Sequence, residues 1–316
     1  MSTHSKKRFH GIITPMVTPL ADLQTLDKPG LERLINHLLE GGVDGIFALG
    51  TTGEGPSHSY ALRRELVERT VDQVAGRVPV LVGITDTAAS EAITMARFCK
   101  DAGVDAVVLA PPCYFKPRQP ELLNYYREMA RRCAMPMFMY NIPSQTGVSI
   151  DPMTVAGALE ERNVIGFKDS SGDMTYFNRL RGVLAERPDI ALLVGPEELL
   201  AEALIIGAHG GVPGGSNLCP RLFASMMDAS IRNDLPELLS LHNRVMDISN
   251  RLYGIGQYSS SFLTSIKTSL KYIGICNDAL AMPFGTIEQS DRETIRRHLV
   301  SLGLLPEGRA VTTKHG

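Results

Sequence analysis

The feature of this sequence that most restricts its fold is a regular alternation of short apolar runs and amphipathic segments between residues 11 and 233. Each run is rich in apolar or small residues and is bounded by Gly, Pro, Ser or Asp, which is typical of strands buried in a parallel sheet. The intervening segments carry apolar residues at helical spacing, as at Leu31, Leu34, Ile35 and Leu38. The eight runs are residues 11–19, 45–50, 78–84, 106–112, 135–141, 164–170, 190–195 and 210–215.

Eight units of strand and helix predict a closed (β/α)8 barrel, a TIM barrel of the α/β class. The chain has 316 residues, and a barrel of this kind needs roughly 250. A doubly wound open sheet, with a second domain, is the alternative for a chain of this length. We favour the barrel because the number of alternating units matches its eightfold repeat.

The strand pattern stops after residue 233, and the remainder predicts helices. Residues 234–253, 260–273 and 291–302 have helical patterns, and Asp234 is positioned to cap the first of them. We therefore expect four regions: a flexible N-terminal tail at 1–10, the barrel at 11–233, a three-helix extension at 234–308 and a disordered tail at 309–316.

Charge and cysteine content exclude several classes of protein. The net charge is −2 and the isoelectric point is about 6.5, so no basic surface for nucleic acid or an anionic membrane is expected. The five cysteines are scattered without a C-x-x-C pair, which favours reduced thiols in a cytoplasmic protein. No apolar run approaches the roughly 18 residues of a membrane span. The histidines lack metal-ligand spacing, and we expect neither a metal nor a cofactor.

Lys168 is the first candidate catalytic residue, because it lies near the C-terminal end of the strand expected within residues 164–170. The other eight of the nine lysines are interpreted as residues of tails, turns or helix surfaces. If Ile165 and Phe167 face the outer helices, then Gly166 and Lys168 face the barrel interior together with Val164. Active sites of such barrels gather at the C-terminal strand ends. An imine requires a neutral amine, which an apolar site favours. A lysine reaching to solvent, or paired with its neighbour Asp169, is the alternative interpretation.

Tyr140 lies near the end of the preceding run, 135–141, and shares a strand face with Phe138. A tyrosine beside an imine-forming lysine can transfer protons as a general acid and base. An ordinary rim tyrosine bonded to the backbone is the alternative.

Two stretches rich in small residues occur at strand-like runs, one after the second run and one at the last run. Residues 50–54 read Gly-Thr-Thr-Gly-Glu and lead into a helix that is predicted to begin near Ser59. Exposed amide groups and hydroxyls can bind a carboxylate here, although a plain strand-to-helix turn explains the residues equally well. Residues 210–217 form a second such stretch, which leaves room for a substrate or simply closes the barrel.

Taken together, Gly50-Thr51-Thr52-Gly53-Glu54, Tyr140-Asn141-Ile142-Pro143-Ser144 and Gly166-Phe167-Lys168-Asp169 occur in the order and spacing of one family. The chain resembles the dihydrodipicolinate synthase/N-acetylneuraminate lyase superfamily of class I aldolases over residues 9–305. The resemblance implies a lyase that forms a Schiff base with a 2-oxo acid such as pyruvate.

The same resemblance implies a role for each matching residue. Lys168 corresponds to the imine-forming lysine, with Tyr140 and Thr51 in the proton relay. Tyr114 corresponds to the tyrosine that a neighbouring subunit inserts into the relay, which implies a homotetramer built as a dimer of dimers. The positions that correspond to substrate-binding residues are Thr52 with the backbone of Gly50 and Gly53, and the pocket-lining Gly195 and Val212.

Departures from the family pattern bear on the substrate. Gln145 replaces the arginine that binds the aldehyde's carboxylate in dihydrodipicolinate synthases, and a glutamine cannot form an ionic clamp. Cys113 replaces the aromatic residue usual beside Tyr114. A neutral Gln145 and the hydroxyl of Ser216 suit a polyhydroxylated chain.

The predicted function is therefore making or breaking the C3–C4 bond of a 2-oxo-3-deoxy sugar acid, or dehydrating it. The alternatives are a synthase condensing pyruvate with aspartate semialdehyde, an N-acetylneuraminate lyase, and a barrel that binds a 2-oxo acid without turnover.

Overall fold

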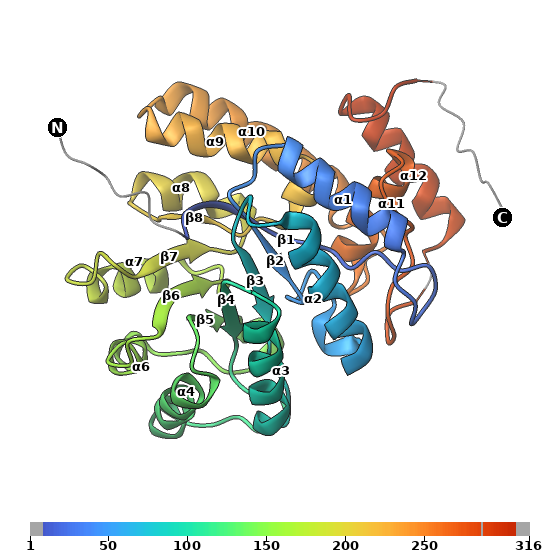
Figure 1. The fold of residues 1–316 in the computed structure, drawn as a ribbon. Helices are drawn as coiled ribbons and strands as arrows, with labels where there is room; N and C mark the ends of the chain where they lie inside the picture. Colours follow the sequence, from blue (N-terminus) through green and yellow to red (C-terminus); the bar gives the residue numbers. More distant parts are fainter. Residues whose placement is uncertain (1–8, 286, 308–316) are drawn as a thin grey trace.

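The computed structural model describes residues 9–285 and 287–307, and eight parallel strands close a barrel at its centre (Figure 1). Each strand pairs with its neighbours in chain order, and β8 pairs with β1 to complete the circle. The predicted barrel is confirmed, and the open sheet is wrong. The strands are β1 (Gly11–Pro15), β2 (Gly45–Ala48), β3 (Val80–Gly83), β4 (Ala106–Leu109), β5 (Met137–Asn141), β6 (Val164–Asp169), β7 (Ala191–Val194) and β8 (Gly210–Gly211).

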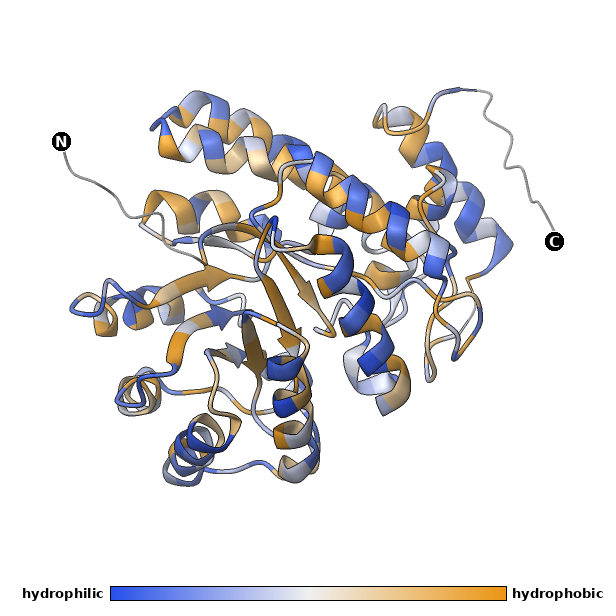
Figure 2. Cartoon of the chain, viewed as in Figure 1, coloured by the Kyte–Doolittle hydropathy of each residue, from blue (hydrophilic) through white to orange (hydrophobic). Residues whose placement is uncertain are grey.

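Amphipathic helices surround the barrel, with their polar faces outward and the apolar strands inside (Figure 2). Ser59 begins the second helix as predicted, because its hydroxyl accepts a hydrogen bond from the amide of Leu62 (3.3 Å). The helices of the barrel are α1 (Lys28–Glu40), α2 (Tyr60–Val74), α3 (Ala89–Asp101), α4 (Gln119–Cys133), α5 (Pro143–Thr146), α6 (Pro152–Ala158), α7 (Met174–Val183), α8 (Leu200–Ile205) and α9 (Pro220–Ile231), with 3-10 turns η1 (Gly55–Ser57), η2 (Glu197–Leu199) and η3 (Gly214–Asn217).

The three C-terminal helices are also confirmed, as α10 (Leu235–Leu252), α11 (Ser261–Tyr272) and α12 (Gln289–Ser301). Asp234 caps α10 by accepting a hydrogen bond from the amide of Glu237 (3.1 Å). In Figure 1, α10 lies beside α9, while α11 and α12 lie together at one side of the barrel.

The N-terminal boundary of the packed structure differs from the predicted tail at residues 1–10. Phe9 is buried in the barrel interior, where its ring packs edge-on against Phe138 with 5.4 Å between centroids. An apolar ring at this end of the barrel covers side chains that would otherwise contact water. The rest of that predicted tail, residues 1–8, and the predicted C-terminal tail at 309–316 lie outside the described residues.

The phase predicted for β6 is wrong at its start and right at its end. Val164 packs in the outer layer and Ile165 against the barrel interior, the reverse of the prediction. The pairing of β5 with β6 shifts here, because Met137 lies opposite Val164 whereas Phe138 lies opposite Gly166. This irregularity reverses the alternation. From Gly166 onward the predicted phase is confirmed.

Two further observations concern the described residues. Within residues 9–285 and 287–307, no helix is long and apolar enough to cross a membrane. All five cysteines are free thiols.

Candidate active site

Lys168 lies near the C-terminal end of β6, directly opposite Tyr140 of β5 in the strand register. Its side chain points into the barrel and the residue is only 5% exposed. The Nζ atom lies 4.1 Å from the centroid of the Tyr140 ring and 5.0 Å from that of Phe47. A buried amine between two aromatic rings is therefore placed at the end of the barrel where substrates bind.

The carboxylate of Asp169 is turned away from this amine. Its Oδ1 atom accepts hydrogen bonds from Asn141 Nδ2 (2.9 Å) and the amide of Ser171 (3.1 Å), while Oδ2 accepts from the Ser171 hydroxyl (2.9 Å). Burial raises the pKa of Asp169, although these hydrogen bonds oppose the shift. Because Lys168 has no ion pair with any described residue, the alternative of a Lys168–Asp169 pair does not hold.

The loop after β2 is held by contacts to its main chain. The carbonyl of Gly53 accepts hydrogen bonds from the Thr18 hydroxyl (2.7 Å) and from Nε2 of His58 (3.0 Å). A Cβ at Gly55 would lie 2.1 Å from the carbonyl oxygen of Leu49, so only glycine fits there. These contacts fix the position of Thr51, whose side chain is exposed at the barrel mouth.

The same loop is anchored by a buried ion pair between Glu54 and Lys267 of α11. Both side chains are completely buried, and the lysine also donates to the carbonyl of Ala279 (2.7 Å). The second carboxylate oxygen accepts from the amide of Ala281 (2.7 Å). Burial lowers the pKa of Lys267, and the neighbouring Glu54 opposes that shift. The prediction that every lysine except Lys168 lies in a tail, turn or helix surface is therefore wrong.

A cavity of about 240 Å³ opens at the C-terminal end of the barrel. Several of the predicted site residues line it, together with apolar side chains such as Phe47. Lys168 adjoins the cavity through its contacts with two of the lining rings. The predicted residues in the lining are Gly50, Thr51, Tyr140 and Gln145, joined by Cys113.

The other predicted positions have different surroundings. Val212 packs in the barrel interior with Tyr140. Gly195 has no space for a side chain, because a Cβ there would lie 1.9 Å from the Ser170 hydroxyl oxygen. Thr52 and Gly53 do not line the cavity. Tyr114 is 79% exposed.

Ser216 is completely buried, and its hydroxyl has internal partners. It donates to the carbonyl of Pro213 (2.6 Å) and lies 2.8 Å from the Thr14 hydroxyl. Ser216 is absent from the cavity lining. We therefore assign it to the closure of the barrel between β8 and β1 rather than to the binding of a substrate hydroxyl.

Arg63 of α2 also lines the cavity, and its position was not predicted from the sequence. Its guanidinium bonds to the carboxylate of Asp86 (3.1 Å) and to the carbonyls of His58 (3.0 Å) and Pro56 (3.3 Å). The sequence gives no signal that this arginine is buried beside the cavity, since most arginines of amphipathic helices lie on the surface.

Glu197, the first residue of η2, links η2 to η3. Its carboxylate accepts hydrogen bonds from the Tyr253 hydroxyl (2.5 Å) and the amide of Gly215 (2.6 Å). Burial raises the pKa of Glu197 to about 7, although the hydrogen bonds from Tyr253 and Gly215 lower it.

The protonation of Glu197 predicts a pH dependence of stability. Between pH 4.5, its ordinary pKa, and about 7, the folded state retains a proton that the unfolded state has lost. The free energy of unfolding is therefore expected to fall as the pH rises through this window, by up to about 3 kcal/mol. Urea unfolding at pH 5 and pH 8 measures this change. Glu197→Gln should reduce the slope, and Glu202→Gln on the exposed side of α8 should leave it intact. An equal slope in Glu197→Gln would contradict the prediction.

Comparison with known proteins shows that this protein is a class I lyase, which acts through a Schiff base on a TIM barrel. Residues 8–302 match the profile of the Dihydrodipicolinate synthetase family, and the chain belongs to that family.

Three relatives illustrate the range of the family. A solved structure of dihydrodipicolinate synthase from Bacteroides thetaiotaomicron has 45% identity and a TM-score of 0.90, covering 92% of this chain and 98% of the other. A 4-hydroxy-tetrahydrodipicolinate synthase of Methanopyrus kandleri is 32% identical over 95% of this chain and 99% of its own. A probable 2-dehydro-3-deoxy-D-pentonate aldolase of Escherichia coli K12 is 30% identical over the same shares.

Proposed function

We propose that this lyase makes or breaks the C3–C4 bond of a 2-oxo-3-deoxy sugar acid, with pyruvate as the common three-carbon product or substrate. The observation that carries the proposal is the buried amine of Lys168 beside the ring of Tyr140, next to a cavity without a cation at position 145. We also propose that the enzyme acts in the cytoplasm, as expected from the sequence.

Covalent catalysis begins at the C2 carbonyl of the substrate. The neutral amine of Lys168 adds to C2, and loss of water from the carbinolamine gives a protonated imine. Tyr140 supplies and removes the protons of these steps, with Thr51 and the partner subunit's tyrosine extending the relay. In cleavage, a proton leaves the C4 hydroxyl and the C3–C4 electron pair moves into the imine, which gives an aldehyde and an enamine. Protonation at C3 and hydrolysis then release pyruvate and restore the amine.

The substrate's carboxylate is assigned to the loop of residues 50–54. Thr51 lies at the cavity, whereas the amides of Glu54 and Gly55 donate within the loop to the carbonyls of Thr51 (3.0 Å) and Gly50 (3.1 Å). The groups proposed to bind the carboxylate are therefore the Thr51 hydroxyl and the main chain from Gly50 to Gly53. Thr52 belongs to the same loop, and we assign its hydroxyl to this carboxylate. Gly195 and Val212 are proposed to shape the pocket from the opposite strands.

Gln145 distinguishes between the two leading substrate classes. It is exposed at the cavity and carries no charge, so it can hydrogen-bond a hydroxylated chain but cannot neutralise a second carboxylate. This favours the sugar-acid substrate. The synthase alternative, condensation of pyruvate with aspartate semialdehyde, is supported by the 45% identity to the Bacteroides enzyme.

Borohydride reduction in the presence of pyruvate, followed by intact mass and peptide mapping, tests the proposed chemistry. A reduced adduct at Lys168 is expected, and its absence would leave only a barrel that binds 2-oxo acids. Cleavage assays with 2-oxo-3-deoxy pentonates and hexonates, and condensation assays with aspartate semialdehyde, then test the substrate. Efficient condensation with aspartate semialdehyde would replace the sugar-acid assignment by the synthase.

Replacing Tyr140 with phenylalanine is expected to lower the turnover number by about 10²–10⁴-fold, because the ring is kept and only the proton-transferring hydroxyl is lost. The thermal transition should change little. Steady-state kinetics and thermal unfolding measure the two effects. Tyr125→Phe in α4 is the matched control, and a turnover number close to that of the unchanged enzyme in Tyr140→Phe would exclude the proposed relay.

We also propose a homotetramer, assembled as a dimer of dimers. Tyr114 and Phe115 are each 79% exposed and contact each other edge-on. Exposed aromatic side chains of this kind are expected to pack against a partner subunit. Analytical ultracentrifugation measures the assembly state, and Tyr114→Ala is expected to lower activity if this tyrosine completes a neighbouring site.

A further inference from the structure

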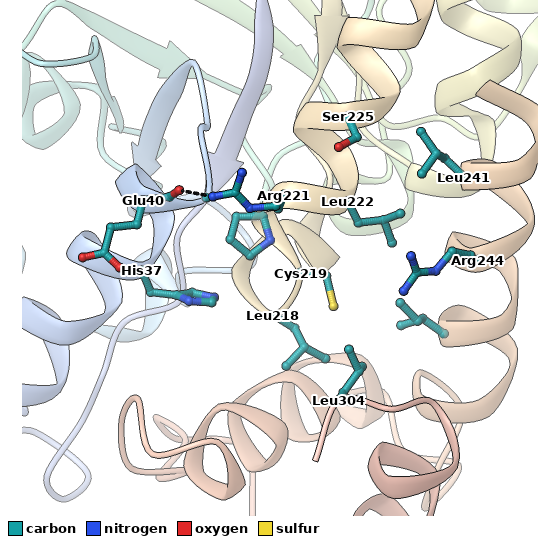
Figure 3. A pocket seen from close by; sticks show the side chains of 13 residues that line it. His37, Glu40, Leu218, Cys219, Arg221, Leu222, Ser225, Leu241, Arg244 and Leu304 are labelled. Atoms are coloured by element: carbon teal, nitrogen blue, oxygen red, sulfur yellow. Dashed lines mark hydrogen bonds between the residues drawn. The ribbon is translucent and has the colours of Figure 1, made fainter. Parts of the chain in front are cut away.

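A second cavity, of about 550 Å³, lies outside the barrel where α1, the start of α9 and α10 meet (Figure 3). It shares no lining residue with the candidate active site. Its size is within the range of small-molecule binding sites, which is roughly 300–1,000 Å³. The proposed lyase chemistry makes no use of this cavity.

One part of the lining is apolar and comes from three separate parts of the chain. Such a surface favours a ligand with an apolar body, because contact removes both surfaces from water. The apolar residues are Leu218, Leu222, Leu241, Ile248 and Leu304.

The polar part of the lining has an excess of positive charge. Arg221 and Arg244 are the two cationic residues, and Glu40 is the one acidic residue in the lining. Arg221 is held in place by donating from Nη2 to the main-chain carbonyl of Glu40 (2.9 Å). In Figure 3, the guanidinium of Arg244 and the ring of His37 point toward Cys219 from opposite walls.

His37 contributes an unused hydrogen-bonding atom. Its Nε2 atom is buried and has no hydrogen-bond partner among the described residues. Burial lowers the pKa of His37, which favours the neutral ring, although hydrogen bonding to the main chain of Leu218 and Asn217 opposes that shift. Buried polar atoms in folded proteins almost always have a partner, so this atom has unmet hydrogen-bonding capacity in the cavity wall.

The N-terminal end of α9 also faces this cavity through Cys219 and Pro220. No side chain caps this twelve-residue helix, and the positive end of its dipole favours an anion. The helix end therefore adds to the effect of the two arginines.

We propose that this cavity binds a small molecule in which an anionic head group, a carboxylate or a phosphate, is joined to an apolar body. The guanidinium of Arg244 binds the head group, since its planar fork matches both anions. The apolar body lies on the leucine-rich part of the lining. The proposal is independent of the lyase reaction.

A ligand in this cavity would lie next to a segment that is fixed to the barrel. Leu218 and Cys219 follow η3 directly, and η3 is fixed to β1 because Asn217 Nδ2 donates to the carbonyl of Pro15 (2.9 Å). The Asn217 side chain also accepts from the amide of Val17 (3.0 Å). The ligand would therefore contact the outer side of the segment that closes the C-terminal end of the barrel.

Isothermal titration calorimetry of the unmodified protein tests the proposal with four probes of equal chain length: octanoate, octyl phosphate, octylamine and octan-1-ol. At least one of the two anions is expected to bind one site per chain at least about tenfold more tightly than the amine or the alcohol. Comparison of octanoate with octyl phosphate identifies the preferred head group. Saturating pyruvate should not displace the anion, because the two cavities share no lining residue.

Variants of α10 assign the binding to this cavity. Arg244→Met is expected to weaken anion binding about tenfold or more, and Arg244→Lys to retain part of it. Arg251→Met is the matched control, because Arg251 is an exposed arginine of the same helix that pairs with Asp247. Anions that bind no more tightly than octan-1-ol, equal losses in Arg244→Met and Arg251→Met, or displacement by pyruvate would overturn the proposal.

Discussion

Lys168→Ala is expected to abolish both the borohydride-trapped pyruvate adduct and turnover, with a loss of roughly 10⁴-fold or more in rate. Alanine leaves no amine to form the imine, and without the imine no group in the site can accept the electrons of the C3–C4 bond. The loop of residues 50–54, to which the substrate's carboxylate is assigned, is untouched by this change, so non-covalent binding of pyruvate should survive. Intact mass after borohydride reduction, initial rates and calorimetry with pyruvate measure the three properties.

Two controls separate this chemical effect from a structural one. Lys100→Ala, in the exposed C-terminal turn of α3, should trap pyruvate as efficiently as the unchanged enzyme. Lys168→Arg keeps a long basic side chain but provides no amine that can form an imine, and it should be as inactive as the alanine variant. A borohydride adduct that persists in Lys168→Ala would mean that another amine forms the imine.

Much of the architecture follows from local patterns in the sequence. Near-continuous apolar runs indicate strands buried on both faces, and Ser59 and Asp234 mark helix starts because a short polar side chain can satisfy a free amide. The position of Lys168 follows from the same reasoning, since parallel strands place their C-terminal ends on one side of the barrel.

The features that the sequence did not predict, or predicted differently, depend on contacts between distant parts of the chain. Lys267 occupies an amphipathic helix, where lysines are usually exposed, and its partner Glu54 is 213 residues away. Ser216 has the chemistry of a substrate ligand, but only the closed barrel brings the Thr14 hydroxyl beside it. The reversed phase of Val164 results from an irregularity in strand pairing, to which the residue types give no signal.

The buried Glu54–Lys267 pair should be among the most sensitive positions for stability. Lys267→Met removes the cation and leaves the carboxylate of Glu54 buried without its ionic partner. Removing one member of a buried ion pair typically costs about 3–5 kcal/mol in the free energy of unfolding. Denaturant unfolding followed by fluorescence or circular dichroism measures the loss. Lys28→Met, which breaks the exposed pair with Glu65, should cost less than about 1 kcal/mol.

A double replacement tests whether the loss arises from the unpaired charge. Glu54→Gln combined with Lys267→Met leaves no buried charge at this position, and it should be less destabilising than Lys267→Met alone. The amide of Ala281 can still donate to the glutamine oxygen, so one of the bonds that hold the loop of residues 50–54 to the C-terminal part of the chain is retained. The Glu54–Lys267 pair anchors the loop that carries Thr51, which is assigned to substrate binding. Lys267→Met should therefore also raise KM for pyruvate more than it lowers kcat, in assays run below the unfolding transition of this variant. A double variant no more stable than Lys267→Met would show that the lysine stabilises the fold through packing and its bond to Ala279, rather than through charge.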